Sequence, residues 1–295
     1  MAVDVRPVRL EDGRPRLRPR GLSQIIGATV DERPFDFTGR VALVTGCGSE
    51  SGIGHACARL LARLGAAVAE TATTDRVEAR AEELCAAGAS ASAHVADLTV
   101  RAEAFALVEA VEREHGRLDI LVNAAGIAQT GIPAPDAAFA DLTEAEWRRE
   151  LDVNLMTAVY TTQAALPGMA RRGYGRVVMI SSVTGPFVMA PRQSGYGASK
   201  GAMDGVMRSI ALDYGRSGVT ANSVAPGWID TASSLDDELV AARSTPIGRA
   251  GTAAEAASVA VFLASEEAAY VIGQTFVVDG GNVIQEPHGI DLYGG

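Results

Sequence analysis

Short apolar runs alternate with amphipathic stretches along most of this chain. The apolar runs are rich in Val, Ile, Leu and Ala, which is typical of strands buried on both faces. Between them, apolar residues recur three or four positions apart, which indicates helices. The predicted strands are residues 41–44, 67–69, 92–95, 118–122, 177–180, 220–224 and 275–278. The predicted helices are residues 55–64, 77–87, 101–115, 144–171, 196–214 and 253–263.

This alternation predicts an α/β fold with one doubly wound parallel sheet and helices on both faces, a Rossmann-type architecture. No linker or change of composition interrupts residues 37–281, so we predict one domain there. Residues 1–36 are rich in Arg, Pro and Asp and lack a period, and we interpret them as a partly ordered N-terminal extension. Residues 282–295 form a C-terminal tail.

Composition and charge exclude several classes of function. The net charge of −10 argues against nucleic acid or an anionic membrane as the main partner, and the basic cluster at residues 14–20 is interpreted as a solvated arm. No apolar run reaches the ~18 residues of a membrane span, and no secretory signal is predicted. Three cysteines, Cys47, Cys57 and Cys85, lack metal-ligand spacing and suit a reducing cytoplasm. We therefore predict a cytoplasmic protein without a metal.

Polar and glycine residues follow the predicted strands at the same end. A glycine-rich loop follows the first strand, Asn123 the fourth, Ser182 the fifth, and Pro226-Gly227 the sixth. Ligands of doubly wound sheets bind beyond the carboxyl ends of the strands. The sequence therefore predicts a binding site at this edge.

The glycine-rich loop spans residues 45–54 and opens a predicted helix. Glycines allow the backbone to approach a pyrophosphate, and the helix N-terminus offers free N–H groups. An ordinary strand-to-helix turn is the alternative, but the position after the first strand favours a dinucleotide. Ser49 and Ser51 are both candidates for the phosphate contact.

The end of the second strand bears on the choice of cofactor. An NAD site usually carries an acidic residue there, on the ribose hydroxyls, yet this chain has Ala72 at that point. Glu70 comes too early and Asp75 too late. Thr73 and Arg76, together with the intervening Thr74, could accept a 2′-phosphate, although Arg76 is equally explained as a solvated charge at a helix start. NADP(H) is favoured and NAD(H) stays possible.

Lys200 is the only lysine among the 26 lysines and arginines, and it lies four residues after Tyr196. Residues four apart are neighbours on one face of a helix. Arginine presents a wide planar fork, whereas lysine is a compact cation on a flexible stem. A site that keeps the one lysine beside a tyrosine indicates a requirement for a small cation close to the phenol.

Taken together, these motifs resemble the classical short-chain dehydrogenase/reductase family, and the resemblance covers residues 37–281. The matching pieces are residues 45–54, Asp97-Leu98, residues 123–126, Asn154, Ser181-Ser182, residues 196–200, residues 226–231 and residues 279–281. Each piece is modest alone, but their order and spacing together are specific to the family.

The resemblance implies roles for four catalytic residues. Tyr196 would be the general acid, and Lys200 would lower the tyrosine pKa and bind the nicotinamide ribose. Ser182 would hydrogen-bond the substrate oxygen, and Asn154 would hold a water that links Lys200 to solvent. The implied cofactor-binding residues are Gly46, Ser49, Ser51, Gly52, Ile53, Thr73, Arg76, Asp97, Leu98, Asn123, Ala124, Gly126, Tyr196, Lys200, Pro226, Gly227, Ile229 and Thr231.

Two features depart from the usual pattern. Five residues separate Gly46 from Gly52 where the family commonly has three, which resembles the loop of some enoyl reductases. Those reductases lack the Tyr-x-x-x-Lys spacing in its usual form, which Tyr196 and Lys200 have here, so a ketone reductase is favoured. Ser182 lies fourteen positions before Tyr196, where thirteen is commoner, and Ser181 is the alternative.

The nearest resemblance is to 3-oxoacyl-carrier-protein reductases, through residues 71–73 and 246–249. It implies NAD(P)-dependent interconversion of a ketone and a secondary alcohol on a small or carrier-bound carbonyl substrate. A natural-product, sugar or steroid-like ketone is the alternative substrate, and a non-catalytic dinucleotide-binding protein is a further alternative. The family implies a homotetramer, or a homodimer.

Overall fold

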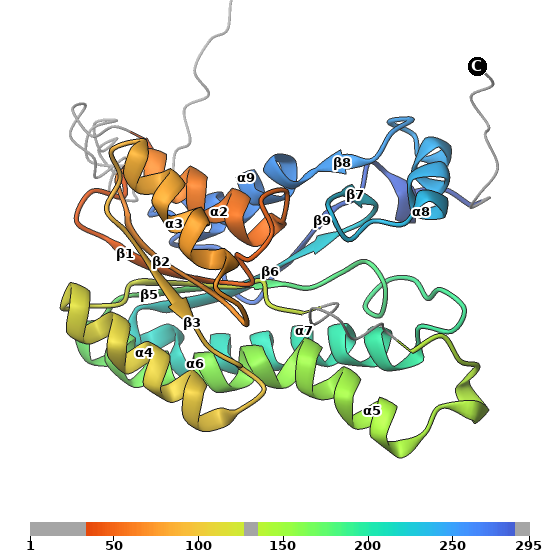
Figure 1. Cartoon of the computed structure of the whole chain (residues 1–295), viewed down its shortest axis with the longest axis horizontal. Helices are drawn as coiled ribbons and strands as arrows, with labels where there is room; N and C mark the ends of the chain where they lie inside the picture. Colours follow the sequence, from red (N-terminus) through yellow and green to blue (C-terminus); the bar gives the residue numbers. More distant parts are fainter. Residues whose placement is uncertain (1–33, 127–134, 287–295) are drawn as a thin grey trace, which may run out of the picture. The chain divides into compact units, whose positions relative to one another are not determined.

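A seven-stranded parallel sheet forms the centre of the computed structural model, which describes residues 34–126 and 135–286 (Figure 1). The strand order is β3-β2-β1-β4-β5-β6-β9, and every pairing is parallel. The strands are β1 (Val41–Thr45), β2 (Ala67–Ala72), β3 (Ala91–Val95), β4 (Ile120–Asn123), β5 (Gly175–Ile180), β6 (Val219–Pro226) and β9 (Thr275–Val278). The predicted sheet is therefore confirmed.

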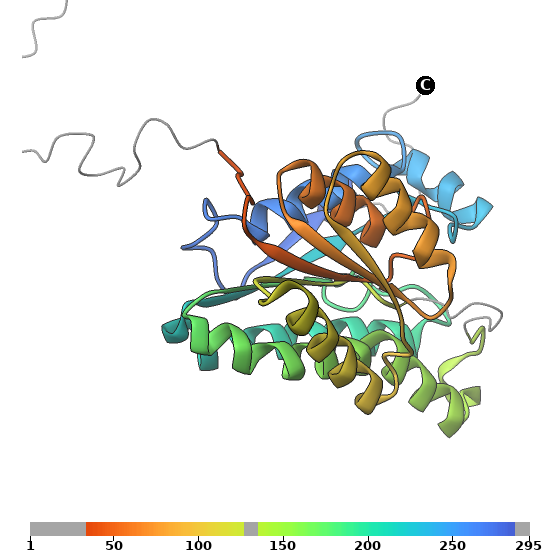
Figure 2. The same ribbon diagram turned by 60° about the vertical axis from the view of Figure 1, so that its left-hand side comes forward.

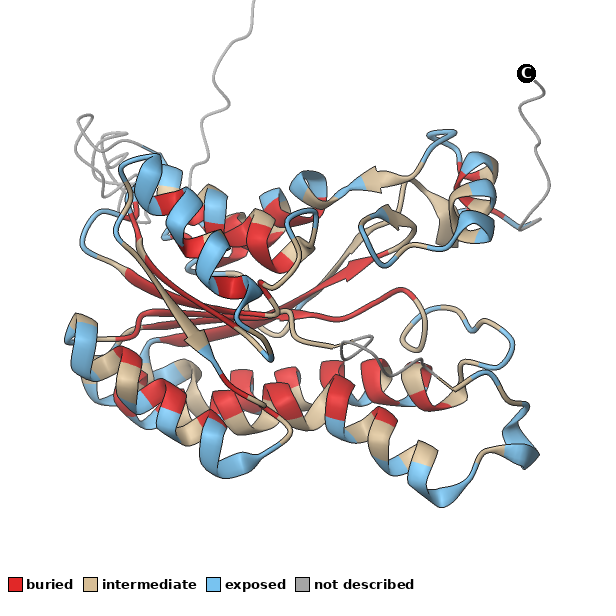
Figure 3. Cartoon of the chain, in the orientation of Figure 1, coloured by how far each residue is buried: buried red, intermediate tan, exposed pale blue. Residues whose placement is uncertain are grey.

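Helices cover both faces of the sheet, as predicted (Figures 1 and 2). One face carries α2 (Ile53–Arg63), α3 (Arg76–Ala86) and α9 (Ala253–Ala264). The other face carries α4 (Arg101–His115), α6 (Thr157–Arg172) and α7 (Ser194–Tyr214). Each layer of helices has its own apolar core against the sheet, and every residue of β1, β4, β5 and β6 is buried (Figure 3). This explains the continuous apolar runs at residues 41–44, 120–122 and 177–180, whereas β6 also buries Thr220, Asn222 and Ser223.

The strand order reverses between β1 and β4. The chain leaves β1 toward β2 and β3 on one side, and continues from β4 toward β5, β6 and β9 on the other. Such a reversal opens a crevice at the carboxyl ends of the two central strands. The glycine-rich loop follows β1 and Ala124 follows β4, so both lie at this point.

The long helix predicted over residues 144–171 is wrong as a single element. The structure divides it into α5 (Glu144–Leu151), a π-helical turn (Asp152–Met156) and α6. A π turn inserts one residue into the helical repeat and leaves the apolar periodicity on either side nearly unchanged. Periodicity alone could therefore not detect it. The turn contains Asn154, one of the predicted catalytic residues.

Several short elements were not predicted from the sequence. They lie mostly beyond the carboxyl ends of the sheet, or connect its helices and strands, and are too short to show a period. They are β7 (Ile229–Asp230), β8 (Gly251–Thr252), α8 (Asp236–Ala241) and the 3₁₀ turns Phe139–Asp141, Gly215–Ser217, Ala242–Ser244 and Asn282–Ile284.

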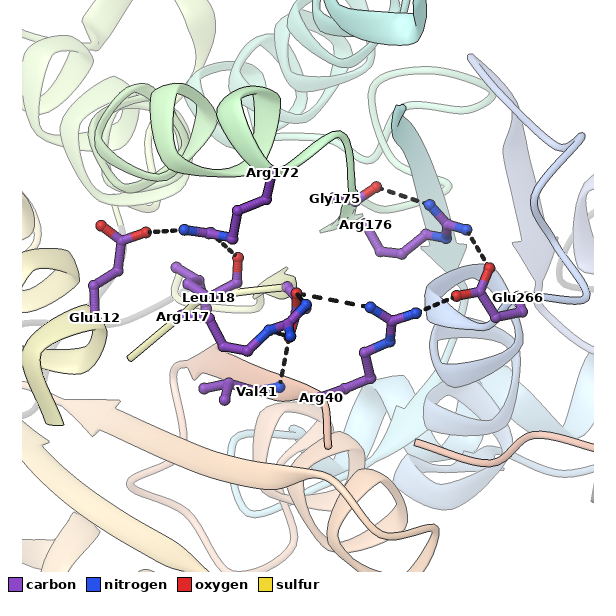
Figure 4. Close-up of polar contacts among 10 residues, drawn as sticks. Arg40, Val41, Glu112, Arg117, Leu118, Arg172, Gly175, Arg176 and Glu266 are labelled. Carbon is purple, nitrogen blue, oxygen red and sulfur yellow. Dashed lines mark hydrogen bonds and ion pairs between the residues drawn. The ribbon is translucent and has the colours of Figure 1, made fainter. Parts of the chain in front are cut away.

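A network of charged side chains closes the amino-terminal edge of the sheet (Figure 4). Asp119, fully buried before β4, accepts a 2.7 Å hydrogen bond from Arg117 and lies 4.0 Å from Arg40. Glu266 links Arg40, at 2.6 Å, to Arg176, at 3.1 Å. Buried charges need such partners. The network ties several strands together at the edge opposite the predicted site.

The predicted N-terminal extension and C-terminal tail fall largely outside the described residues. Phe37, where the domain was predicted to begin, is buried, and its N–H donates to the carbonyl of Leu64. The basic cluster at residues 14–20 and residues 287–295 lie outside the described part of the chain. Among the described helices, none is long and apolar enough to cross a membrane.

Candidate active site

Tyr196 and Lys200 lie one turn apart near the start of α7. The Lys200 nitrogen is 5.7 Å from the centroid of the Tyr196 ring and donates a 2.8 Å hydrogen bond to the carbonyl oxygen of Ile180. Ile180 is the last residue of β5, so this bond fixes the lysine at the carboxyl end of the sheet. Lys200 is 3% exposed and Tyr196 is half-buried.

Ser182 rather than Ser181 faces the tyrosine. The Ser182 side chain is hydrogen-bonded to Tyr196, and its oxygen also accepts a 3.1 Å hydrogen bond from the N–H of Thr184. The Ser181 hydroxyl instead donates to the backbone carbonyl of Lys200, at 3.3 Å. The extra residue before Tyr196 is therefore absorbed in the loop that follows β5.

The fourth predicted catalytic residue, Asn154, lies fully buried in the π turn. Gly126 lies against both its amide and the lysine: a Cβ at Gly126 would be 2.9 Å from the Asn154 Oδ1 and 3.6 Å from the Lys200 nitrogen. The φ of Gly126 is +152°. Only glycine leaves room for the amide oxygen at this position. The structure thus gathers all four predicted catalytic residues at the ends of β4 and β5.

Burial shifts the pKa values of Tyr196 and Lys200 in the directions that favour the uncharged form of each side chain. Burial raises the pKa of Tyr196 to about 12, and the hydrogen bond with Ser182 opposes this rise. The carboxylates of Glu238 and Glu150 raise the tyrosine pKa further. Burial lowers the pKa of Lys200 to about 8, and the nearby charge of Asp204 opposes that change. The lysine is thus a cation that can lose its proton near neutral pH.

The glycine-rich loop fits a pyrophosphate. Gly46 has φ +75°, and a Cβ there would lie 2.6 Å from the carbonyl oxygen of Ala124, so only glycine allows the loop to pass β4 so closely. Gly52 is the N-cap of α2, and the described helix has no side-chain cap and no acidic residue in its first turn. Its first N–H groups are therefore suited to hold an anion. Ile53 is the first residue of that helix.

The two loop serines have different positions. The Ser51 hydroxyl accepts a 2.8 Å hydrogen bond from the N–H of Ala232, which follows β7. This contact brings the glycine-rich loop against the segment that contains Thr231. The carbonyl of Ser49 instead accepts from the N–H of Gly52 within the loop.

The predicted 2′-phosphate contacts lie beside the same loop. Arg76 begins α3, and its Nη2 is 3.7 Å from the position that a Cβ of Gly48 would take. Its Nε donates a 3.1 Å hydrogen bond to the Thr74 hydroxyl. Glu70 is fully buried, lies 2.8 Å from the Nδ1 of His55 and is hydrogen-bonded to the side chain of Cys47 in the loop, so its carboxylate is occupied inside the protein. Ala72, at the end of β2, contributes no acid.

Some predicted cofactor contacts have structural partners instead. The Asn123 amide donates to Thr162 at 2.9 Å and accepts from Thr161 at 2.7 Å, so this side chain joins β4 to α6. Leu98 is buried in the core between the sheet and α4. Asp97 accepts hydrogen bonds from the N–H and hydroxyl of Thr99. For Asn123 and Leu98 only the backbone can face a cofactor.

The remaining predicted contacts follow β6. Pro226 ends that strand, and the N–H of Gly227 donates to Val278 on β9. Ile229 lies in β7, and the Thr231 hydroxyl shares hydrogen bonds with Ser233 and Ser234.

Two buried carboxylates near the site were missed in the sequence. Glu150 contacts the Asn154 side chain, and Asp204 lies one turn beyond Lys200 on α7. Charged residues are normally predicted to be exposed, so neither was considered. Their spacing of four from Asn154 and from Lys200 was the available signal. The described residues contain no group of His, Cys, Asp or Glu that could hold a metal ion.

Comparison with known proteins agrees with this geometry. Residues 46–282 match the family profile described as enoyl-(acyl carrier protein) reductase. This profile belongs to the short-chain dehydrogenase/reductases that the motifs resemble. The chain belongs to the short-chain dehydrogenase/reductase family. The predicted resemblance is therefore confirmed, and the protein is an oxidoreductase of this family.

Named relatives and solved structures of the family align along nearly their whole length. Oxidoreductase UcpA of Escherichia coli (strain K12) is 36% identical over 262 residues, covering 85% of this chain and 97% of that protein. The 3-oxoacyl-[acyl-carrier-protein] reductase of the same organism is 36% identical over 252 residues, covering 84% and 98%. The crystal structure of a candidate gluconate dehydrogenase from Agrobacterium tumefaciens superimposes with a TM-score of 0.79 at 32% identity, covering 86% of this chain and 100% of that one.

Proposed function

We propose that this chain interconverts a ketone and a secondary alcohol by hydride transfer with NADP(H). The observation that carries the proposal is the placement of Tyr196, Ser182 and Lys200 at one point beyond β5. Such a group provides a proton donor, a hydrogen bond to the reacting oxygen, and a cation that favours the phenolate. A surface Tyr–Lys pair at this spacing would be neither buried nor joined to a serine.

Each residue has a definite task in the reductive direction. Tyr196 donates its phenolic proton to the carbonyl oxygen of the substrate as charge develops there. Ser182 donates a hydrogen bond to the same oxygen, and Lys200 stabilises the phenolate that remains. The nicotinamide, when bound, supplies the hydride. Gly46 and Gly52 provide the close backbone approach and the free N–H groups for its pyrophosphate.

The preference for NADP(H) rests on the end of β2. Ala72 stands where an acidic residue would bind the ribose hydroxyls of NAD, and Arg76 lies over the glycine-rich loop. A guanidinium close to the loop favours an additional phosphate.

We further propose that the substrate is a 3-oxoacyl or related carbonyl compound, small or bound to a carrier. The support is the alignment with a named 3-oxoacyl-[acyl-carrier-protein] reductase and with the enoyl-(acyl carrier protein) reductase profile. A natural-product, sugar or steroid-like ketone is the alternative, and the similarity to a solved structure of a candidate gluconate dehydrogenase supports the sugar among these. The enzyme is proposed to be cytoplasmic, since its three cysteines are free, and to form a homotetramer or a homodimer.

The test is oxidation of NADPH and of NADH against a panel of 3-oxoacyl thioesters, cyclic ketones and keto-sugars. Tyr196→Phe should lose at least about 100-fold in kcat with at least one substrate, because it removes the proton donor. Tyr270→Phe is the matched control, since that tyrosine is fully exposed, and it should leave the rate unchanged. If Tyr196→Phe keeps most of the wild-type rate, Tyr196 is not the acid. Cofactor binding without turnover of any carbonyl would favour a non-catalytic binding protein instead.

A further inference from the structure

Glu150 is the one buried residue of α5. Its exposure is 3%, whereas the flanking Arg149 and Leu151 are half-buried. The first turn of the helix is capped by Thr143 and Glu146 through a capping box, so Glu150 has no part in starting the helix. A carboxylate is retained in the interior of a protein only with polar partners. The partners of the Glu150 carboxylate therefore indicate its role.

The partners of Glu150 belong to the candidate active site. The Asn154 Nδ2 is 3.3 Å from the Glu150 Oε2 and 3.2 Å from the Glu150 backbone carbonyl. The Ser199 hydroxyl, one residue before Lys200, donates to that same carbonyl at 3.0 Å. The other carboxylate oxygen lies 3.1 Å from the Nη1 of Arg149. The backbone carbonyl of Glu150 therefore joins the π turn to α7, and its carboxylate adds a second acceptor for the Asn154 amide.

A carboxylate constrains a neighbouring amide in only one way. It accepts hydrogen bonds and cannot donate them, so Asn154 must turn its NH₂ group toward Glu150. The amide oxygen then lies on the opposite side, where it is next to Gly126, as is the Lys200 nitrogen. An amide oxygen in that place is an acceptor for a cation, whereas an NH₂ group would repel it.

We propose that Glu150 is a positioning residue of this active site, which fixes the Asn154 amide with its oxygen toward Lys200. This inference rests on the proposed function, because the site it orders is the one assigned to carbonyl reduction. In this chain the buried Glu150 carboxylate determines that Lys200 meets the oxygen of the Asn154 amide and not its NH₂ group.

The arrangement is sensitive to pH. Burial raises the pKa of Glu150 and Arg149 opposes the rise. The titratable group of α7 that interacts with Glu150 is Tyr196, whose pKa the Glu150 carboxylate raises. A protonated Glu150 side chain has an O–H donor in place of one acceptor oxygen, so at acidic pH only the backbone carbonyl of Glu150 still holds the Asn154 NH₂ group. The contribution of the carboxylate is complete only above the raised pKa of Glu150.

The direct test is the side-chain NMR signal of Asn154. The chain has four asparagines, so labelling with ¹⁵N-asparagine gives four NH₂ pairs, and Asn154→Asp identifies the pair by its loss. In the wild type that pair should titrate with a midpoint above the ordinary glutamate pKa of about 4.3. Glu150→Gln, which has nearly the same shape, should abolish this titration.

The control is Asp152→Asn. It removes one negative charge two residues away, at an exposed position in the π turn, and should leave the Asn154 titration in place. An Asn154 pair that does not titrate in the wild type, or that titrates equally in Glu150→Gln, would overturn the proposal. No substrate or cofactor is present in this measurement.

The consequence for turnover is measured separately. With any reducible ketone, Glu150→Leu should lower kcat on the order of 10- to 100-fold with little change in KM, since a misplaced group costs rate more than binding. Glu150→Gln should remove the acidic limb of the pH profile that belongs to Glu150, and Asp152→Asn should keep it. If no carbonyl is reduced by the wild type, the proposed function fails, while the Asn154 signal still tests the positioning role.

Discussion

Lys200 donates a 2.8 Å hydrogen bond from its ammonium group to the carbonyl oxygen of Ile180. The bond joins the second turn of α7 to the last residue of β5, and the lysine is almost completely buried. A single small cation is therefore held between a helix, a strand end and the Cα of Gly126. This confinement gives a physical reason for a lysine in a chain whose other long cationic side chains are arginines.

Lys200→Arg should reduce the rate of carbonyl reduction at least about 100-fold while the fold is kept. The guanidinium is wider than the ammonium and cannot reach the Ile180 carbonyl and lie beside Gly126 without moving the Tyr196 ring. The measurement is kcat with circular dichroism as the check of folding. Arg208→Lys, the reverse exchange at an exposed position of the same helix, should be silent. A nearly active Lys200→Arg enzyme would contradict the requirement for a small cation.

The pKa of Lys200 can be measured directly because the chain has one lysine. Protein labelled with ¹³C-lysine, without a lysine-containing tag, gives one side-chain signal, which should titrate at about 8. Asp204→Asn should lower this midpoint further, since the carboxylate favours the ammonium form.

Thr275→Val is the control for that titration. It removes the 2.9 Å hydrogen bond that Thr275 donates to Asp204 but retains the negative charge, so the lysine midpoint should fall less than in Asp204→Asn. A wild-type midpoint near the ordinary lysine value of about 10.4 would show that burial does not act on the ammonium as described.

The sequence was sufficient to predict the sheet, the helices that cover it apart from the break between α5 and α6, and the four residues that meet at its edge. The strands could be predicted because burial on both faces makes most of them short runs dominated by apolar residues. The proposed catalytic group could be predicted because Tyr196 and Lys200 share one helix, while Ser182 lies two residues after the end of β5.

The supporting contacts could not be predicted, and Glu150 shows why. Its side chain is buried against Gly195 of α7, next to the π turn, and the periodicity of the sequence does not reveal that turn. Asn123 shows the converse: its place after β4 suggested a cofactor contact, but the side chain bonds Thr161 and Thr162 on α6. Position along the chain predicted which residues lie at the carboxyl edge of the sheet, but it did not predict where each side chain points.

Lys200→Met should change the pH dependence of stability. The pKa of Lys200 in the folded state, about 8, is below its value of about 10.4 in the unfolded chain. Between these pH values the unfolded chain binds more protons, so the stability of the wild type rises with pH there. From pH 7 to pH 10.5 the wild type should gain about 2–3 kcal/mol relative to Lys200→Met, which has no charge to lose. Urea unfolding of both proteins at several pH values measures this difference, and parallel curves would refute it.

Arg76→Ala should change the preference between cofactors. The guanidinium lies beside the glycine-rich loop, and Ala72 leaves the end of β2 without an acid, so a 2′-phosphate there would gain a charge-assisted hydrogen bond. Loss of such a bond is worth about 1.5–3 kcal/mol, so kcat/KM for NADPH should fall roughly 10- to 100-fold. The value for NADH, which lacks that phosphate, should change little. Arg59→Ala, at an exposed position of α2, controls for the loss of a positive charge near the loop. Equal losses with both cofactors would mean that Arg76 supports the loop and does not select the cofactor.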